Sequence, residues 1–148
     1  MNLVKRTKTT RVMNAVAAGT TDQTSSWVDM ANFDGVEFTI LFGTITAGAV
    51  TSVKLQGATD GSGTGATDLT GTSITVADTD DNKVAILDLY QPDRTYRYIA
   101  AYVDRGTQNA VIDGIVAKQY APRNLPTTQD STTVLGSEAH ASEAAGTA

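Results

Sequence analysis

Few residues of this 148-residue chain are of the types that perform nucleophilic or metal chemistry. It has no cysteine and a single histidine, His140. Without cysteine there is no thiol nucleophile, thiolate metal site or redox pair, and one histidine does not make an imidazole cluster. A Ser-His-Asp triad would have to use His140, which lies in a polar stretch of small residues. Most familiar catalytic arrangements are therefore excluded.

Carboxylates are the abundant chemical group, with 13 aspartates against three glutamates. Many aspartates lie at expected strand ends or turns, where the residue has a structural role: Asp88, Asp93, Asp104 and Asp113. No two of them stand out as the acid and base of a hydrolase. The sequence predicts a protein that is not an enzyme.

Two short motifs resemble ligand loops but lack essential residues. Asp78, Asp80 and Asn82 match the first three ligand positions of a calcium loop, yet Lys83 stands where glycine is needed and Leu89 where glutamate is needed. The GSGTG run has neither the Gly-Lys-Ser/Thr of a Walker loop nor the third glycine of a dinucleotide fingerprint. We expect no cofactor and no metal, and read residues 57–71 as a long surface loop.

Three tyrosines could form a binding platform. Alternation places Tyr96, Tyr98 and Tyr102 on one face of an expected strand, and bases lie nearby at Arg94, Arg97 and Arg105. Aromatic rings interleaved with bases stack on single-stranded nucleic acid or sugar. We favour the alternative of a core or subunit contact, because tyrosine packs its ring and keeps a polar tip.

The elements that would position these residues are expected to be strands. The chain has 24 threonines and 13 glycines with little glutamate, a mixture that favours strands and tight turns. Period-2 alternation predicts two hairpins, 36–42 with 51–56 and 95–103 with 110–120, with a bulge at Gly114. Residues 83–90 carry aliphatic side chains on both faces, which predicts a strand in mid-sheet or at an interface. We predict a single antiparallel β-sandwich, jelly-roll-like or Greek-key.

Charge divides the chain into three segments. Residues 1–11 form a basic N-terminal arm (+4), residues 12–126 form the sandwich domain (−6), and residues 127–148 form a small-residue C-terminal tail (−3). An acidic body does not favour direct nucleic-acid binding, and no apolar run reaches the length of a membrane span. The arm could dock on an acidic protein surface, and the tail has only two larger aliphatic residues, Val134 and Leu135.

Two long segments, 33–61 and 81–126, resemble small structural proteins of tailed-bacteriophage virions that decorate or cement capsid shells. The resemblance implies a protein made in the host bacterial cytoplasm and placed on the outer capsid surface. It would bind the major capsid protein and itself, as a homotrimer. The partner-binding residues would then be the basic arm, the tyrosines and the tail aliphatics: Lys5, Arg6, Lys8, Arg11, Tyr96, Tyr98, Tyr102, Val134 and Leu135.

Two other functions remain open. A tail, head-completion or fibre-associated virion protein would have the same Thr/Gly/Asp-rich composition. A carbohydrate-binding β-sandwich could use Tyr96, Tyr98, Trp27 and loop aspartates to hold sugar rings. Copy number per particle distinguishes a tail, head-completion or fibre-associated protein from a decoration protein. Glycan binding identifies the carbohydrate-binding module.

Overall fold

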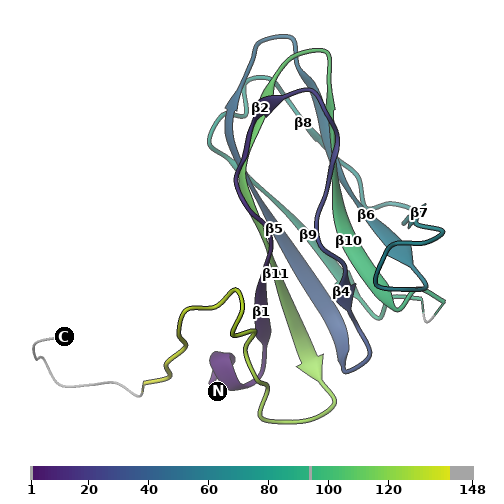
Figure 1. The fold of residues 1–148 in the computed structure, drawn as a ribbon, viewed down its shortest axis with the longest axis vertical. Coiled ribbons are helices and arrows are strands. Elements are labelled where there is room, and N and C mark those ends of the chain that lie inside the picture. Colours follow the sequence, from purple (N-terminus) through teal and green to yellow (C-terminus); the bar gives the residue numbers. More distant parts are fainter. Residues whose placement is uncertain (1, 94, 141–148) are drawn as a thin grey trace, which may run out of the picture.

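The computed structural model describes residues 2–93 and 95–140. Two antiparallel sheets pack face to face, so the predicted all-β sandwich is confirmed (Figure 1). Sheet A contains β1 (Lys8–Met13), β2 (Val16–Gly19), β5 (Phe33–Ile45), β9 (Val84–Tyr90) and β11 (Ala110–Pro122). Sheet B contains β3 (Gln23–Thr24), β4 (Val28–Asp29), β6 (Val50–Ala58), β7 (Thr67–Asp68), β8 (Ile74–Val76) and β10 (Tyr98–Gly106). A short 3₁₀ turn, η1 (Leu3–Lys5), precedes β1. Among the described residues no helix is long and apolar enough to cross a bilayer.

The strand order is that of a jelly roll. Sheet A runs β1-β11-β5-β9, with β2 also on β11, and sheet B runs β3-β10-β6-β7, with β4 also on β10 and β8 also on β6. A jelly roll has eight strand positions. Here β1 and β2 together fill one position, as do β3 with β4 and β7 with β8, and each of the other five strands fills one. The positions pair first with last, second with seventh, third with sixth and fourth with fifth, as in a long hairpin wrapped into two sheets.

Both predicted hairpins are wrong. β5 lies in sheet A and its successor β6 in sheet B, and β10 and β11 are likewise split between the sheets. Each connection is an arch that carries the chain from one sheet to the other. The two arches contact each other, since the Thr46 N–H donates to the Asn109 carbonyl at 2.9 Å and the Thr107 hydroxyl to the Gly48 carbonyl at 2.7 Å. Stacking the strands in opposite sheets lets their apolar faces meet across the core instead of lying side by side.

The core follows from the period-2 alternation. The inward positions of β5, β6, β10 and β11 are filled by aliphatic and aromatic side chains that are fully buried: Val36, Phe38, Ile40, Val53, Leu55, Ile99, Val103, Ile112 and Ile115. The predicted bulge at Gly114 is confirmed, because the register of β11 on β5 shifts there and the residue has φ +149°. A Cβ at this position would lie 3.2 Å from the carbonyl oxygen of Met13.

One predicted boundary and one predicted strand position differ in the structure. Strand β1 begins at Lys8, so the expected boundary between arm and domain at residue 11 falls inside a strand of sheet A. Strand β5 begins at Phe33, directly after a turn at 31–32. Strand β9 is at the edge of sheet A, not in mid-sheet, and its outward side chains are exposed.

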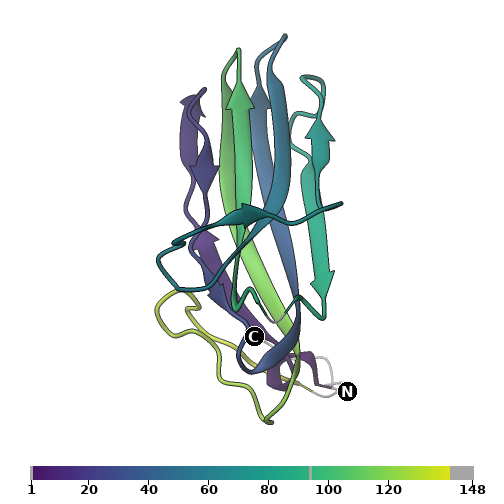
Figure 2. The ribbon, with the colours of Figure 1, turned by 90° about the vertical axis from the view of Figure 1, so that its right-hand side faces the viewer.

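The loop predicted over 57–71 contains β7 and folds back across sheet B (Figure 2). Its first two residues end β6, and the rest connects the fourth position of the jelly roll to the fifth, which includes β7. Asp60 organises it by accepting hydrogen bonds from the backbone N–H groups of Ser62 and Thr64, and these bonds with the Ser62 hydroxyl lower the pKa of Asp60 to about 2. The loop is therefore an ordered strap.

Candidate interaction surfaces

The two ends of the described chain are bound to each other. The Thr127 N–H donates to the Lys5 carbonyl at 3.0 Å. The side-chain amide of Gln129 donates to the carbonyls of Val4 and Thr7, at 2.8 and 2.7 Å, and its oxygen accepts from the Thr9 N–H at 2.8 Å. Residues 2–11 and 127–135 therefore form one composite surface, hereafter the terminal surface, at the end of the sandwich opposite the arches (Figure 1).

The tail also closes an edge of sheet A. In β1 the N–H groups of Thr9 and Arg11 point away from β11. They are satisfied by the side-chain oxygens of Gln129 and Thr133, at 2.8 and 3.2 Å. Further along, the Val12 carbonyl accepts from the Ser26 N–H at 2.8 Å. Because tail side chains occupy the edge N–H groups of Thr9 and Arg11, β1 is protected against pairing with another chain there.

The four basic residues expected to bind a partner lie on the terminal surface. Lys5, Arg6 and Arg11 are exposed and Lys8 is partly exposed. None of the four forms an ion pair with a described residue. Four bases elsewhere do, in the pairs Lys54–Asp68, Lys83–Asp80, Arg97–Asp29 and Arg123–Asp34. Among the described residues, no close ion pair neutralises the charge of these four side chains.

The tail aliphatics follow the tail residues that are hydrogen-bonded to the N-terminal segment. Leu135 is fully exposed at 108 %, and Val134 is half-buried with its N–H donating to the Asp130 carbonyl at 2.8 Å. His140 contacts Glu138, with 2.8 Å between Nε2 and Oε2. The remainder of the predicted tail, 141–148, lies outside the described residues, as do Met1 and Arg94.

The three tyrosines do not share a face, so that prediction is wrong for Tyr96. Strand β10 begins only at Tyr98, and the preceding residues form a turn. Tyr96 packs against the core, where a Cβ on Gly57 would lie 2.6 Å from its ring. Tyr98 and Tyr102 lie on the outer face of sheet B, with Arg97 5.3 Å from the first ring centre and Lys54 4.9 Å from the second.

Arg105, expected beside this platform, is buried instead. Only 3 % of it is exposed, and its guanidinium donates to the carbonyls of Thr21, Ala17 and Ala110 at 2.7, 3.0 and 2.8 Å. Burial lowers the pKa of Arg105. Its role is structural, because it joins β10 in sheet B to the chain around β2 and to the start of β11 in sheet A.

The aspartates also serve structural purposes. Asp78 and Asp81 accept from the N–H groups of Gly48 and Ile45, each at 2.6 Å, and so attach the acidic turn before β9 to the first arch. The bidentate bond from Arg97 lowers the pKa of Asp29. Among the described residues, no three His, Asp or Glu side chains gather where a metal ion could be held.

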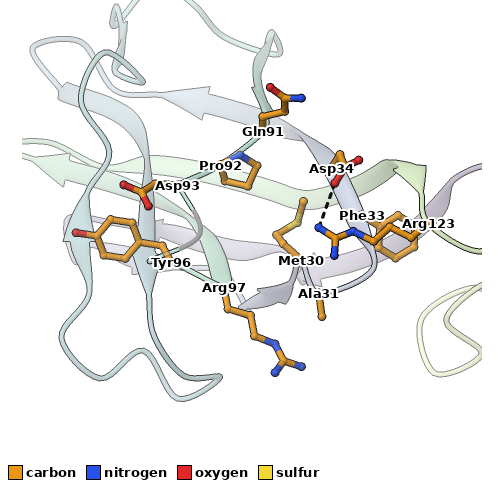
Figure 3. A pocket seen from close by; sticks show the side chains of 10 residues that line it. All are labelled: Met30, Ala31, Phe33, Asp34, Gln91, Pro92, Asp93, Tyr96, Arg97 and Arg123. Carbon is orange, nitrogen blue, oxygen red and sulfur yellow. Dashed lines mark hydrogen bonds and ion pairs between the residues drawn. The ribbon is translucent and has the colours of Figure 1, made fainter.

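One pocket, of about 650 Å³, opens between the start of β5 and the turn before β10 (Figure 3). Apolar walls come from Met30, Phe33, Pro92 and Tyr96. The other lining residues are Ala31 and five polar residues, Asp34, Gln91, Asp93, Arg97 and Arg123. Arg123 reaches Asp34 at 3.4 Å across the rim, as the dashed line in Figure 3 marks. Sequence patterns did not indicate this pocket, because its lining comes from three segments that are far apart in the sequence.

Comparison with known proteins gives no family. No protein-family model matches the chain, and a search of curated proteins finds no similar sequence. Function must therefore be inferred from the fold and its surfaces.

Proposed function

We propose that this protein is a non-enzymatic structural component of a tailed-phage virion that decorates the outer capsid surface. In this proposal it binds subunits of the major capsid protein through the terminal surface and so stabilises the shell. The observation that carries the proposal is the gathering, at one end of an otherwise acidic molecule, of four bases that form no ion pair with a described residue. Such a charge distribution orients a protein on an acidic partner and speeds its association.

The fold supports the proposal by analogy. Jelly rolls recur among viral capsid proteins, and also among lectins. Fold alone does not determine function, so the weight rests on the terminal surface. Because Gln129 and Thr127 hold the N-terminal segment in place, a partner meets the bases already arranged and loses less entropy on binding.

Charge reversal tests the binding surface. The variant Lys5→Glu/Arg6→Glu changes two exposed bases outside β1, and Lys54→Glu/Lys83→Glu is a control with the same change in net charge. Co-sedimentation with shells of the encoding phage that lack the protein should show affinity falling about tenfold or more for the first variant only. Equal loss for both variants would show that net charge, not the terminal surface, governs binding.

Copy number tests the location. Quantitative mass spectrometry of purified virions should find the protein at a level comparable with shell subunits. A few copies per particle would instead favour a tail, head-completion or fibre-associated protein.

A carbohydrate-binding role is the second candidate, and the pocket beside Tyr96 favours it. An aromatic ring with amide, carboxylate and guanidinium groups is suited to sugar hydroxyls. Trp27 is not among the residues that line this pocket, and it packs against the strap at Gly63. A glycan array with the wild type and Tyr96→Ala decides: binding lost in the variant supports this role, and absence of any wild-type binding removes it.

A further inference from the structure

The two edges of sheet A differ in how they are closed. The β1 edge is covered by Gln129, Thr133 and Ser26, as described above. The β9 edge is open: none of the outward backbone groups of β9 has a hydrogen-bond partner among the described residues. A long unprotected edge with apolar side chains is a template for another strand.

The register identifies which residues offer these groups. The Phe42 N–H donates to the Lys83 carbonyl and the Gln91 N–H to the Asp34 carbonyl, so odd-numbered residues of this segment face β5. In an antiparallel ladder this direction alternates. Val84, Ile86, Asp88 and Tyr90 therefore direct their N–H and carbonyl groups outward.

The same four residues carry an exposed apolar surface. Exposed fractions are 54 % for Val84, 53 % for Ile86 and 59 % for Tyr90. Asp88 is the one charged side chain among them, and its carboxylate accepts from the Tyr120 hydroxyl at 2.7 Å. The lysines, prolines and bulges that usually protect an edge are missing from β9.

We propose that β9 pairs antiparallel with β9 of a second copy, about a two-fold axis at Leu87. Leu87 is the midpoint of β9, so this register pairs Val84 with Tyr90 of the second copy and Ile86 with its Asp88. All four residues with outward N–H and carbonyl groups in each strand then form hydrogen bonds with the second copy. On the inner side, Leu87 meets its own copy and Ala85 meets Leu89, which makes the two cores continuous.

Self-pairing is favoured over another partner because the edge is complementary to itself. The aromatic and β-branched pair of Tyr90 and Val84 is a stabilising cross-strand combination. A register centred on Asp88 would place two carboxylates opposite each other. A register centred on Ile86 would place Tyr90 opposite Asn82, outside the strand. The resulting two-fold dimer differs from the trimer implied by the virion resemblance, and it stands independently of the capsid role.

Two substitutions at one exposed position test both the pairing and the register. Ile86→Glu places an acid opposite Asp88 of the second copy, and Ile86→Lys places a base there. By analytical ultracentrifugation of the full chain, we expect a wild-type dimer, a dimer retained in Ile86→Lys, and a dissociation constant raised about tenfold or more in Ile86→Glu. Val50→Glu, at an exposed valine of sheet B, is the control and should stay dimeric.

A wild type that is monomeric or trimeric at all concentrations would overturn the proposal, as would equal behaviour of the two Ile86 variants or dissociation of Val50→Glu. Amide exchange of the wild type gives a check that needs no variant. Raising the concentration should slow exchange at Val84, Ile86, Asp88 and Tyr90, while Ala85, Leu87 and Leu89 stay protected throughout. Unchanged exchange at the four outward amides would contradict the pairing.

Discussion

The indole ring of Trp27 occupies the space into which a side chain at Gly63 would project. A Cβ at Gly63 would lie 2.5 Å from Nε1 of the indole, and the residue has φ +80°. Trp27 directly precedes β4, while Gly63 belongs to the strap that leaves β6, so this contact fixes the strap across the outer face of sheet B.

Gly63→Ala should therefore destabilise the protein by about 2 kcal/mol, from backbone strain together with displacement of the ring. Gly71→Ala is the matched control, because Gly71 has the same φ of +80° with open space around its Cβ position. Urea unfolding followed by fluorescence of Trp27, the single tryptophan, gives both the stability and the ring environment. If both variants lose the same stability, the ring contact contributes nothing.

Arg105→Met should cost about 3 kcal/mol or more, because three buried carbonyl groups lose a charged donor. Arg105→Lys should recover only part of this, since an ammonium group lacks the planar fork. Arg97→Met, which removes a surface ion pair with Asp29, should cost under about 1 kcal/mol. Thermal denaturation of the three variants ranks their losses of stability. A larger loss in Arg97→Met than in Arg105→Met would contradict the role of Arg105 in joining the two sheets.

Thr51→Val should leave stability unchanged or raise it by about 1 kcal/mol. The Thr51 hydroxyl is buried and has no partner among the described residues, so valine removes an unpaired polar group at constant shape. Thr72→Val is the control, because the Thr72 hydroxyl donates to the Leu69 carbonyl and accepts from the Leu55 N–H. That variant should be destabilised by about 1 kcal/mol. The midpoints of urea unfolding compare the two variants. If Thr51→Val loses as much stability as Thr72→Val, the Thr51 hydroxyl has a hydrogen-bond partner after all.

Stability should fall at alkaline pH through Tyr102. Its hydroxyl donates to the Asp22 carboxylate at 2.6 Å, which raises the pKa of Tyr102 to about 12 and lowers the pKa of Asp22. Between the unfolded value of 10.0 and about 12, the folded state holds more protons than the unfolded state, so stability declines as pH rises. Asp22 gives the acid counterpart, a contribution present above 3.8 and lost as pH falls through its lowered pKa.

Tyr102→Phe should reduce the alkaline decline, measured by urea midpoints across this range. It should not abolish it, because burial together with the Asp88 bond raises the pKa of Tyr120 to about 12 as well. The double variant Tyr102→Phe/Tyr120→Phe should show the weakest dependence. An unchanged slope in Tyr102→Phe would contradict the Tyr102–Asp22 bond.

Sequence patterns were sufficient for the strands and the sandwich, but not for the partners of each strand. Val36, Phe38 and Ile40 alternate in the same way whether the next strand lies beside β5 or across the core, so the arches were mistaken for hairpins. Gly114 was predictable because a strand interior rarely contains glycine without a bulge. The pairing of both termini was not, because Gln129 and Thr133 act through side-chain hydrogen bonds that leave no apolar periodicity.

The pairing of β1 with β11 also has a consequence for synthesis. Lys8 lies opposite Gln119, so β1 cannot pair until a segment about 110 residues further along the chain has left the ribosome. Strand β5 lacks its neighbour β11 until β11 has been synthesised. Contacts between segments so far apart in the sequence form slowly. Gln129 follows β11, so the terminal surface is assembled only after residue 129 has been synthesised. A translation product that stops before Gln129 would lack the side chain that joins the two segments of this surface.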